Sequence, residues 1–399
     1  MIYGGIDWAD RGFQICFIDE RGQVLEEFSI KKTREGFEEL LQRTRCYPEV
    51  EFSIETGRSS LVDFLLGHGY RIYWINPNRM SAFRSRYKSS RVKDDRFDAY
   101  VLAQVLRGDK ASLPLIKPLP EKVERLRLIW KDLEVVLKEQ TRLKNRLYSV
   151  LKEYYPAFLN CFQDPFSPAA LCFLERYPTL EQACKLSRRG LKIFFNSLHV
   201  YSDSFVQRVY DGLSSSLEVR PVLVESRSQL ARVLAQQLWQ IRELIKEYEK
   251  QLEKASQEVE ELRCFEGIKG LGLKTRVGIL VYFYHREWKD FRQAQGATGL
   301  SPATFQSGKY CYVHFRKSCI KWARDLFTEL AYTTLIWQSW ARLYYDRKRK
   351  EGKKHYHALR CLANVWVKIL FKLWKQGQNY NHEKHYIAAT QPLVMRLIS

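Results

Sequence analysis

Short apolar runs separated by polar turns fill the first 75 residues. Their lengths and their β-branched and aromatic content predict strands over residues 2–8, 13–18, 23–28, 50–55 and 70–75. The spacing of Phe37, Leu40 and Leu41 predicts a helix over 33–44, and residues 60–66 are expected to form another. Three opening strands followed by alternating helices and strands predict an α/β sheet with an antiparallel edge.

Farther along, two stretches repeat apolar residues in alternating steps of three and four. The first contains Leu126, Ile129, Leu133, Val136, Leu143, Leu147 and Val150, with Gln140 as its polar member. The second contains Leu234, Leu238, Ile241, Ile245, Tyr248, Leu252, Ala255, Val259 and Leu262. This periodicity predicts two long helices that form an antiparallel hairpin, a dimer seam, or both.

These patterns divide the 399 residues into three predicted domains. An α/β domain is expected over 1–115, coiled-coil helices over 116–262, and a mainly helical domain over 263–399. The proline-containing segment 109–119 is expected to be a linker. Residues 156–221, between the two heptad stretches, contain several prolines and show no periodicity from which a role follows.

The chain is strongly basic. Lysine and arginine number 66 against 45 aspartates and glutamates, which gives a net charge of +21 and a pI near 9.5. Enzymes of small metabolites rarely need this imbalance, whereas a nucleic-acid-binding protein places cations against phosphates. Aromatic residues make up 14% of the chain and interleave with the positive charge, which suits base stacking. The alternative is a basic protein whose charge only maintains solubility.

Cysteine usage and the start of the chain bear on its compartment. Nine cysteines without a CxxC pair argue against a zinc knuckle or a disulfide framework and indicate reduced thiols. The N-terminus opens directly into a strand-like run, so no secretory signal is expected. No uninterrupted apolar stretch approaches the ~18 residues of a membrane span. We therefore expect a cytoplasmic protein without a membrane partner.

Acidic residues stand where the predicted elements could bring them together. Asp7 lies in the first strand, and Glu55 ends a neighbouring strand, where ligand sites of open α/β sheets gather. Asp95 and Asp98, three residues apart, would share one face of a helix. These oxygen donors suit Mg²⁺, and a carboxylate among apolar neighbours is costly unless it is paired or binds metal. The alternatives are hydrogen-bonded strand acids and an Asp-rich first turn that complements the helix dipole.

Basic residues precede these acids and recur in the last third of the chain. Those predicted to contact a nucleic-acid backbone are Arg84, Arg86, Lys88, Arg91, Lys93, Lys269, Lys274, Lys309, Arg347, Lys348, Arg349, Lys350, Lys353 and Lys354. A merely solvated loop is the alternative for the cluster 342–354. His382 and His385 lack a third ligand at metal-site spacing, so we expect solvated or phosphate-facing histidines.

Two features after Cys264 could take part in nucleic-acid chemistry. The glycines of 267–272 precede an apolar run, as in a helix-hairpin-helix turn whose amides hold a phosphate; a plain glycine-rich turn fits equally well. Ser307 is followed by Gly308 and Lys309, so it could be a nucleophile on a turn with cations nearby. A structural turn serine is the alternative.

Together these motifs resemble one family, the insertion-sequence transposases of the "insertion sequence 110" group. The resemblance covers about residues 1–155 and 225–375. Its markers, in chain order, are Gly5-Ile6-Asp7, Glu55-Thr56-Gly57, Asn76-Pro77, the segment 93–99, the segment 267–272, Phe291, the segment 299–302, Gln306-Ser307-Gly308, Tyr344-Tyr345, Gly352-Lys353 and Ala358. One departure is Lys93-Asp94, where the family more usually has Lys-Thr or Lys-Asn.

The resemblance implies an RNase H-like, RuvC-like DEDD domain followed by helices and a C-terminal serine domain. Asp7, Glu55, Asp95 and Asp98 would be the ligands of two Mg²⁺ ions, with Mn²⁺ as the substitute, and Asp94 would be an extra acid. Ser307 would form a covalent phosphoserine link to DNA. The implied partners are double-stranded donor and target DNA, a structured non-coding bridge RNA, and further copies of the chain in a homodimer or homotetramer. The implied location is the nucleoid of a bacterial or archaeal cell.

Three other functions compete with this interpretation. A RuvC-like junction resolvase or nuclease would hydrolyse DNA through metal-activated water and leave Ser307 structural. A sugar-kinase or actin-like ATPase also has a first strand ending near Gly-Ile-Asp, but it needs a second phosphate loop and gains nothing from the charge. A non-catalytic RNA-binding protein would bind without any metal-dependent cleavage.

Overall fold

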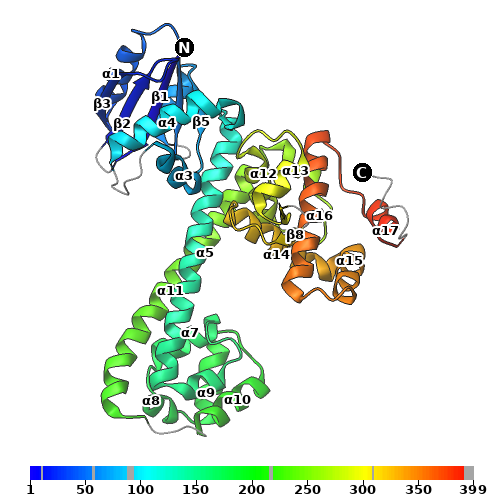
Figure 1. Ribbon diagram of the computed structural model, residues 1–399. Coiled ribbons are helices and arrows are strands. Elements are labelled where there is room, and N and C mark those ends of the chain that lie inside the picture. The colour runs from blue at the N-terminus through cyan, green and yellow to red at the C-terminus, as the bar shows by residue number, and fades with distance from the viewer. Residues whose placement is uncertain (10–11, 56–58, 88–93, 215–218, 308–309, 391–399) are drawn as a thin grey trace. The chain divides into compact units, whose positions relative to one another are not determined.

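The computed structural model describes residues 1–9, 12–55, 59–87, 94–214, 219–307 and 310–390 (Figure 1). Packing contacts group the chain into two compact units, Met1–Glu124 with Val259–Ser399, and Arg125–Glu258. Across the ranges just given, no helix is both long enough and apolar enough to cross a membrane. The α/β sheet and the C-terminal helices belong to the first unit, and most of the heptad region forms the second.

A six-stranded sheet in the order β3-β2-β1-β4-β5-β6 organises the N-terminal region. Its strands are β1 (Ile2–Trp8), β2 (Gly12–Ile18), β3 (Val24–Lys31), β4 (Val50–Ile54), β5 (Arg71–Trp74) and β6 (Leu115–Ile116). β1 pairs antiparallel with β2 and parallel with β4, and β4 pairs parallel with β5. The prediction of a mixed α/β sheet with an antiparallel edge is therefore confirmed, and the order is consistent with a RuvC-like fold.

The segment 109–119 is more than the plain linker that we predicted. It contains a short 3-10 helix, η1 (Lys110–Ser112), and β6, which pairs antiparallel with β5. Two residues of strand are too few to show any periodicity, and their pairing partner lies about forty residues earlier in the chain. The prediction of a linker here was wrong.

Helices cover both faces of the sheet (Figure 1). They are α1 (Arg34–Thr44), α2 (Ser60–Gly67), α3 (Pro77–Tyr87) and α4 (Asp95–Asp109). Alternation along β2 divides its side chains between the two layers. Ile15 and Phe17 pack in the cluster that contains the apolar residues of α1 and α2, whereas Cys16 packs with Ala99 and Ala103 of α4.

Helix α4 lies unusually close to the centre of the sheet, and Gly5 of β1 makes this possible. A Cβ atom at Gly5 would stand 1.9 Å from the Ala99 carbonyl oxygen and 2.5 Å from the Ala103 nitrogen. The Ser53 hydroxyl of β4 donates a hydrogen bond of 2.9 Å to the Leu102 carbonyl oxygen. Backbone therefore meets backbone at Gly5, and the first turn of α4 is brought to the end of β1.

The second unit is a helical domain. It contains most of α5 (Glu121–Tyr154), then α6 (Pro156–Cys161), α7 (Pro168–Arg176), α8 (Leu180–Cys184), α9 (Arg188–Ser197), α10 (Asp203–Ser214) and α11 (Pro221–Ser256). The prediction of two long helices is confirmed by α5 and α11, although α11 ends before Val259 and Leu262. Segment 156–221 packs its short helices around buried rings that include Phe158, Phe173 and Phe195.

The C-terminal region is mainly helical, as predicted, with one small antiparallel ribbon. Its elements are η2 (Glu260–Phe265), α12 (Leu273–Tyr284), α13 (Phe291–Thr298), β7 (Ala303–Ser307), β8 (Tyr310–His314), α14 (Lys321–Trp337), α15 (Ser339–Lys350), α16 (His355–Gln376) and α17 (His382–Thr390). Trp366 of α16 is fully buried and donates a hydrogen bond of 2.9 Å to the Thr334 hydroxyl of α14. This packing forms the body that supports the ribbon.

Candidate active site

Asp7 lies one residue before the end of β1, and its side chain is only 7% exposed. The period-two alternation of a strand puts Asp7 on the same face as Gly5, the face that α4 covers. A carboxylate in this position has lost much of its hydration, so it needs a cation or a proton. The contact at Gly5 therefore determines which groups Asp7 meets.

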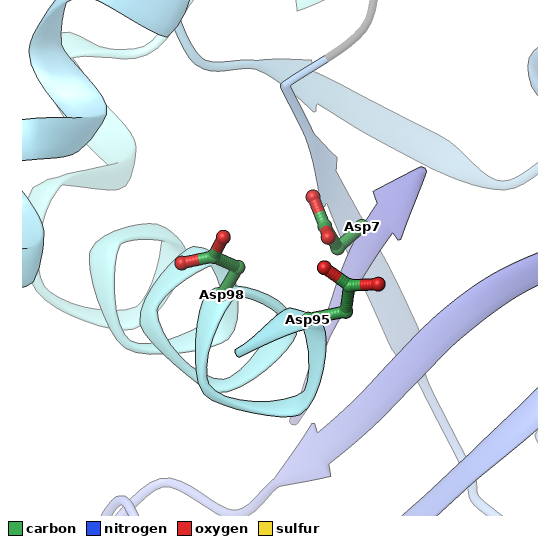
Figure 2. Close-up of side chains that lie close together, drawn as sticks. All are labelled: Asp7, Asp95 and Asp98. Carbon is green, nitrogen blue, oxygen red and sulfur yellow. The ribbon is translucent and has the colours of Figure 1, made fainter. Parts of the chain in front are cut away.

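Three carboxylates converge at this point (Figure 2). Asp95 and Asp98 lie in the first turn of α4, and one oxygen from each of Asp7, Asp95 and Asp98 falls within 4.8 Å of the others. Asp98 is 1% exposed, and Asp95 is half-buried. The helical spacing that predicted a shared face for Asp95 and Asp98 thus brings both toward the strand acid.

The charges in this cluster repel one another. Burial, followed by the proximity of Asp98, Asp95 and Glu55, raises the pKa of Asp7 to about 6, while a hydrogen bond from the Trp8 backbone acts in the opposite direction. Among the described residues, no direct ion pair to Asp7 relieves this repulsion. The fold alone holds the acids together. An all-oxygen donor set of this kind fits a hard divalent cation such as Mg²⁺ or Mn²⁺.

Arg84 of α3 is the cation that this structure places in the cluster. Its guanidinium forks onto Asp98, donating from Nε to one carboxylate oxygen and from a terminal nitrogen to the other at 2.7 Å. The same guanidinium lies 3.9 Å from a carboxylate oxygen of Glu55. We predicted Arg84 as a phosphate contact, and here it is engaged by the acids. Sequence reasoning did not anticipate this pairing, because it grouped Arg84 with the basic residues that follow it in the sequence.

Glu55 stands apart from the other three predicted ligands. It follows the last residue of β4, is half-buried, and its backbone carbonyl accepts a hydrogen bond of 3.0 Å from the Trp74 indole. It does not belong to the group of three acids whose oxygens lie within 4.8 Å of one another. The described structure thus assembles three of the four predicted carboxylates and brings the fourth to them through Arg84.

Asp94 has a structural task at the start of α4. It is the N-cap residue, with extended backbone, and its side chain accepts a hydrogen bond of 3.1 Å from the Arg96 amide. A capping carboxylate satisfies an amide that the helix leaves unpaired and complements the helix dipole. Of the three acids in segment 94–98, Asp94 is the one that the geometry does not place in the metal-compatible cluster.

The remaining predicted phosphate contacts fall into different environments. Lys88, Arg91, Lys93 and Lys309 lie outside the described residues. Arg86 is 4.0 Å from Asp109, Lys348 and Lys353 both bind Glu351, and Arg349 donates to the Lys353 carbonyl oxygen. Arg347 lies over the Tyr344 ring, and Lys274 is half-buried. Lys269, Lys350 and Lys354 are exposed. Part of the predicted basic cluster therefore stabilises its own turn.

The glycine-rich turn at 267–272 uses backbone conformations that glycine adopts more readily than other residues. Gly267 and Gly270 have φ values of 79° and 90°, which favour glycine. A Cβ atom at Gly270 would stand 2.7 Å from the Trp337 ring. The element before the turn is the 3-10 helix η2, and the element after it is α12. The turn therefore joins a 3-10 helix to an α-helix, which differs from a hairpin between two α-helices.

Ser307 is the last residue of β7, so it ends a strand that we did not predict. The antiparallel register pairs Ser307 with Tyr310 of β8. The ribbon follows Gly299, whose φ of 69° ends α13 in the left-handed conformation. A Cβ atom at Gly299 would stand 2.3 Å from the Arg324 guanidinium, which explains the glycine of the segment 299–302.

The prediction of solvated or phosphate-facing histidines at 382 and 385 was wrong for His385. His385 packs against the rings of Trp340 and Tyr380, and burial lowers its pKa to about 4. His382 shares hydrogen bonds with the Gln338 amide oxygen at 2.8 Å and the Ser339 hydroxyl at 3.2 Å. His385 is therefore part of the packing that holds α17 and not a solvated or phosphate-facing residue.

Comparison with known proteins places these two regions in one family. A family model for DEDD-type transposases of the IS110 group, described as Transposase, matches residues 4–156, and the model described as Transposase IS116/IS110/IS902 family matches residues 262–346. The first range contains the acidic cluster, and the second contains Ser307 and its ribbon.

Full-length relatives agree with the two models. A mini-circle protein of Streptomyces coelicolor, named as a transposase candidate for IS117, is 26% identical over 410 residues and covers 98% of both chains. An uncharacterized 44.8 kDa protein of insertion element IS116 from Streptomyces clavuligerus is 24% identical over 380 residues, covering 93% of this chain and 94% of that protein. The chain belongs to the IS110 family of insertion-element transposases.

Proposed function

We propose that this transposase cuts and exchanges DNA strands with two reactive centres, a metal-binding acidic site and a nucleophilic serine, and that an RNA guides it. The observation on which the proposal rests is the convergence of Asp7, Asp95 and Asp98 beside Arg84. Mutually repelling acids are costly to bury together, so a fold that holds them together indicates a cation-dependent task.

The acids would position and charge-balance the substrate site. Asp7, Asp95 and Asp98 would hold a divalent ion, two ions being the expected number, and Glu55 would complete the set. When bound, such an ion supplies positive charge to a scissile phosphate. Arg84 neutralises Asp98 in the structure, and its fork geometry equally suits a phosphate. We propose that Arg84 turns from Asp98 to the DNA backbone when the site is loaded.

Ser307 would carry out the covalent step. Its hydroxyl oxygen attacks the phosphorus, a serine–phosphate bond forms, and the phosphorus–oxygen bond to the departing strand breaks. The serine proton passes to the departing oxygen, so one phosphodiester replaces another. A free strand hydroxyl later reverses the exchange and restores the serine. Bond energy is thus conserved without added nucleotide, as strand exchange requires.

Guidance by RNA would supply the sequence choice. The chain has a net charge of +21, and we recognise no dedicated base-reading element in its sequence. Base pairing between a structured RNA and both DNA partners would let the protein read shape and backbone. The resemblance to the family also leads us to propose assembly as a homodimer or homotetramer. Purified protein stripped of RNA should lose site-specific cleavage and regain it when RNA from the flanks of its element is added.

The acids are tested by single substitution. Asp7→Ala, Glu55→Ala, Asp95→Ala and Asp98→Ala should each abolish metal-dependent strand cleavage of a donor–target substrate. Each protein should still bind nucleic acid, which separates lost chemistry from lost folding. Wild-type cleavage after removal of any two of these carboxylates would refute a shared metal site.

The serine is tested through its adduct. Wild-type protein incubated with labelled DNA and Mg²⁺ should give a covalent protein–DNA band on a denaturing gel, and Ser307→Ala should give none. Ser318→Ala, at an exposed serine beyond the same ribbon, is the matched control and should keep the band. An adduct that persists in Ser307→Ala would place the nucleophile elsewhere.

Hydrolysis by a RuvC-like nuclease is the second candidate. It is favoured by one observation: the three carboxylates converge within the N-terminal region without any residue of the serine region. In that case cleavage would be metal-dependent, would leave no adduct, and would survive Ser307→Ala unchanged. The same gel therefore distinguishes the two candidates.

A further inference from the structure

The ribbon of β7 and β8 exposes large rings to solvent. Among the described residues it is a two-stranded sheet, in which Tyr310 is 83% exposed and Tyr312 is 62% exposed. An isolated two-stranded ribbon is marginally stable in water. Neighbouring exposed aromatic residues on such a ribbon indicate a surface that a partner covers.

The base of the ribbon is fixed to the helical body. The Ser301 hydroxyl donates to the Asn364 amide oxygen at 3.1 Å, just before β7. Just after β8, the Phe315 ring contacts two guanidinium groups, with its centroid 4.2 Å from that of Arg324 and 4.6 Å from that of Arg360. Arg324 also donates to the Arg316 carbonyl oxygen. The exposed rings thus stand on a fixed base and do not belong to a loose loop.

The exposed rings form a row along one face of β8. Tyr310, Tyr312 and His314 alternate with Cys311 and Val313, so the period of the strand places the three rings on the same side. The rings of Tyr312 and His314 are stacked, with centroids 5.4 Å apart and planes inclined by 20°. The register pairs Tyr310, at the end of this row, with Ser307.

The charge of the sequence segment that contains the row favours an anionic partner. No aspartate or glutamate occurs from Phe291 to Arg324, while this segment contains Arg292, Lys309, Arg316, Lys317, Lys321 and Arg324. Flat rings among cations without acids suit a chain of phosphates that bears planar groups, which is a nucleic acid. An acidic protein would match the charge, but it would not need a row of stacking rings.

The spacing of the row favours unpaired bases over a duplex. Same-face residues of a strand recur every ~6.6 Å, and the Tyr312 and His314 ring centroids are 5.4 Å apart. Both spacings exceed the ~3.4 Å rise between bases of one strand in B-DNA. Successive rings therefore match a strand whose bases are unstacked and spread apart. Tyrosine rings also lack the paired donors that read base edges in a major groove.

We propose that the row Tyr310, Tyr312 and His314 stacks with unpaired bases of the DNA strand that is cut. The proposal rests on the proposed function through Ser307, because the row borders that serine in the register and the serine acts on DNA. It adds a substrate property, since the strand would be recognised in an opened form next to the cleavage point. The rings would hold the exposed bases while the strand changes partners.

The test measures binding without cleavage, using full-length protein in EDTA. Fluorescence anisotropy would compare a DNA duplex that contains a short unpaired loop, the fully paired duplex, and a single-stranded RNA of the loop sequence. Tyr310→Ala combined with Tyr312→Ala should weaken binding of the looped DNA by about 5-fold or more per ring, and that of the paired duplex little. Tyr310→Phe with Tyr312→Phe should retain binding. Val313→Ala, at an exposed position that alternates with the row, is the matched control and should bind like wild type.

Each outcome decides the proposal. Equal binding of looped DNA by the alanine and wild-type proteins would overturn it, as would an equal loss on paired DNA, which indicates a ribbon in a duplex groove. A loss confined to RNA would assign the row to the guide and also overturn it. Circular dichroism of the alanine variant, together with recovery in the phenylalanine variant, excludes misfolding. Absence of a Ser307 adduct in Mg²⁺ would instead refute the proposed function and leave this binding result intact.

Discussion

The acidic cluster and the serine ribbon are built in opposite ways. Asp7 and Asp98 are almost completely buried between β1 and α4, where backbone packs on backbone at Gly5. The ribbon whose first strand ends at Ser307 is two strands wide and exposes Tyr310 and Tyr312. Groups that repel each other must be held by a rigid frame, because the separated arrangement has the lower energy. The exposed rings of the ribbon do not repel one another, so the ribbon needs only a fixed base to present them to a planar partner.

A second contrast lies within the sheet itself. Glu51 of β4 is as deeply buried as Asp98, but it has Lys110 against it and Arg71 at 3.6 Å. Charge pairing holds it, since neither of its oxygens makes a well-aligned hydrogen bond. Asp7 has three acids as its main charged neighbours. Burial alone therefore does not indicate a reactive carboxylate, and the sign of the surrounding charge does.

The largest effect should come from exchanging these two acids for amides. Asp7→Asn should reduce cleavage by at least about 10²-fold and leave stability unchanged or higher, because it removes repulsion. Glu51→Gln should leave cleavage within a few-fold while it lowers the free energy of unfolding by on the order of 2 kcal/mol. That cost is reduced because Lys110 is one-third exposed. Cleavage rates and urea denaturation measure the pair. The comparison fails if Glu51→Gln costs as much activity as Asp7→Asn.

The rigid frame is tested at Gly5. Gly5→Ala places a Cβ atom 1.9 Å from the Ala99 carbonyl oxygen, so α4 must move away from the sheet. We expect a loss of about 3 kcal/mol or more in the free energy of unfolding, and loss of cleavage in whatever protein remains folded. Gly108→Ala, near the end of the same helix with no atom within 4 Å of the added Cβ, is the control. It should be neutral or stabilising by up to about 1 kcal/mol. Equal thermal stability of the two variants would contradict the close packing.

Repulsion in the cluster predicts a pH dependence. A carboxyl group whose folded pKa exceeds its unfolded value stabilises the metal-free protein at low pH, and this contribution is lost as the pH rises through the folded pKa. With the pKa of Asp7 raised from 3.8 to about 6, the loss should fall between about pH 4 and pH 6 and amount to at most about 3 kcal/mol. Urea denaturation of wild type and Asp7→Asn in EDTA should show the difference between them changing across that window. A difference independent of pH would show that Asp7 titrates normally.

The base of the ribbon should respond more weakly. Gly299→Ala forces a left-handed residue with φ of 69° and a Cβ atom 2.3 Å from the Arg324 guanidinium. A cost of about 1–3 kcal/mol is expected, less than at Gly5 because a side chain can move where a backbone cannot. Gly296→Ala, three residues earlier in α13 and in open space, should be neutral or slightly stabilising. Thermal denaturation compares them. If the Gly299 variant unfolds like wild type, the ribbon is not fixed at this end.

The regular parts of the fold could be predicted from the sequence, and the closest contacts could not. The strands over 2–8 and 13–18 followed from the length and the β-branched and aromatic content of their runs. The shared face of Asp95 and Asp98 followed from the helical period. Helix α3 was not predicted, although it begins at Pro77 and proline is favoured at the first position of a helix. The glycine of Gly5-Ile6-Asp7 was noticed as a motif, but its reason, the approach of α4, depends on a partner about ninety residues away.

The ribbon shows a different limit. Tyr310, Tyr312 and Val313 offer the aromatic and β-branched content of a strand, a signal that could have predicted β8. We interpreted the segment around Ser307 as a turn because Ser-Gly pairs are common there. Arg84 was likewise assigned to phosphate by its neighbours in sequence, whereas its place beside Asp98 follows from the packing of α3 on α4. The local sequence therefore indicates which residue types a site contains, but only the tertiary packing shows which residues contact one another.

The smallest effect should be at Asp94, and it separates capping from metal binding. Asp94→Ala removes the hydrogen bond to the Arg96 amide and should lower the free energy of unfolding by about 1 kcal/mol, while cleavage persists. Asp94→Ser keeps a side-chain oxygen for the cap and should restore the stability without restoring a charge. Asp95→Ala, one residue later, should do the reverse: it abolishes cleavage and leaves the cap in place. Full Mg²⁺ titrations of cleavage complete the test, because a capping residue leaves the metal dependence unchanged. A higher Mg²⁺ requirement in Asp94→Ser would instead make Asp94 a member of the acidic site.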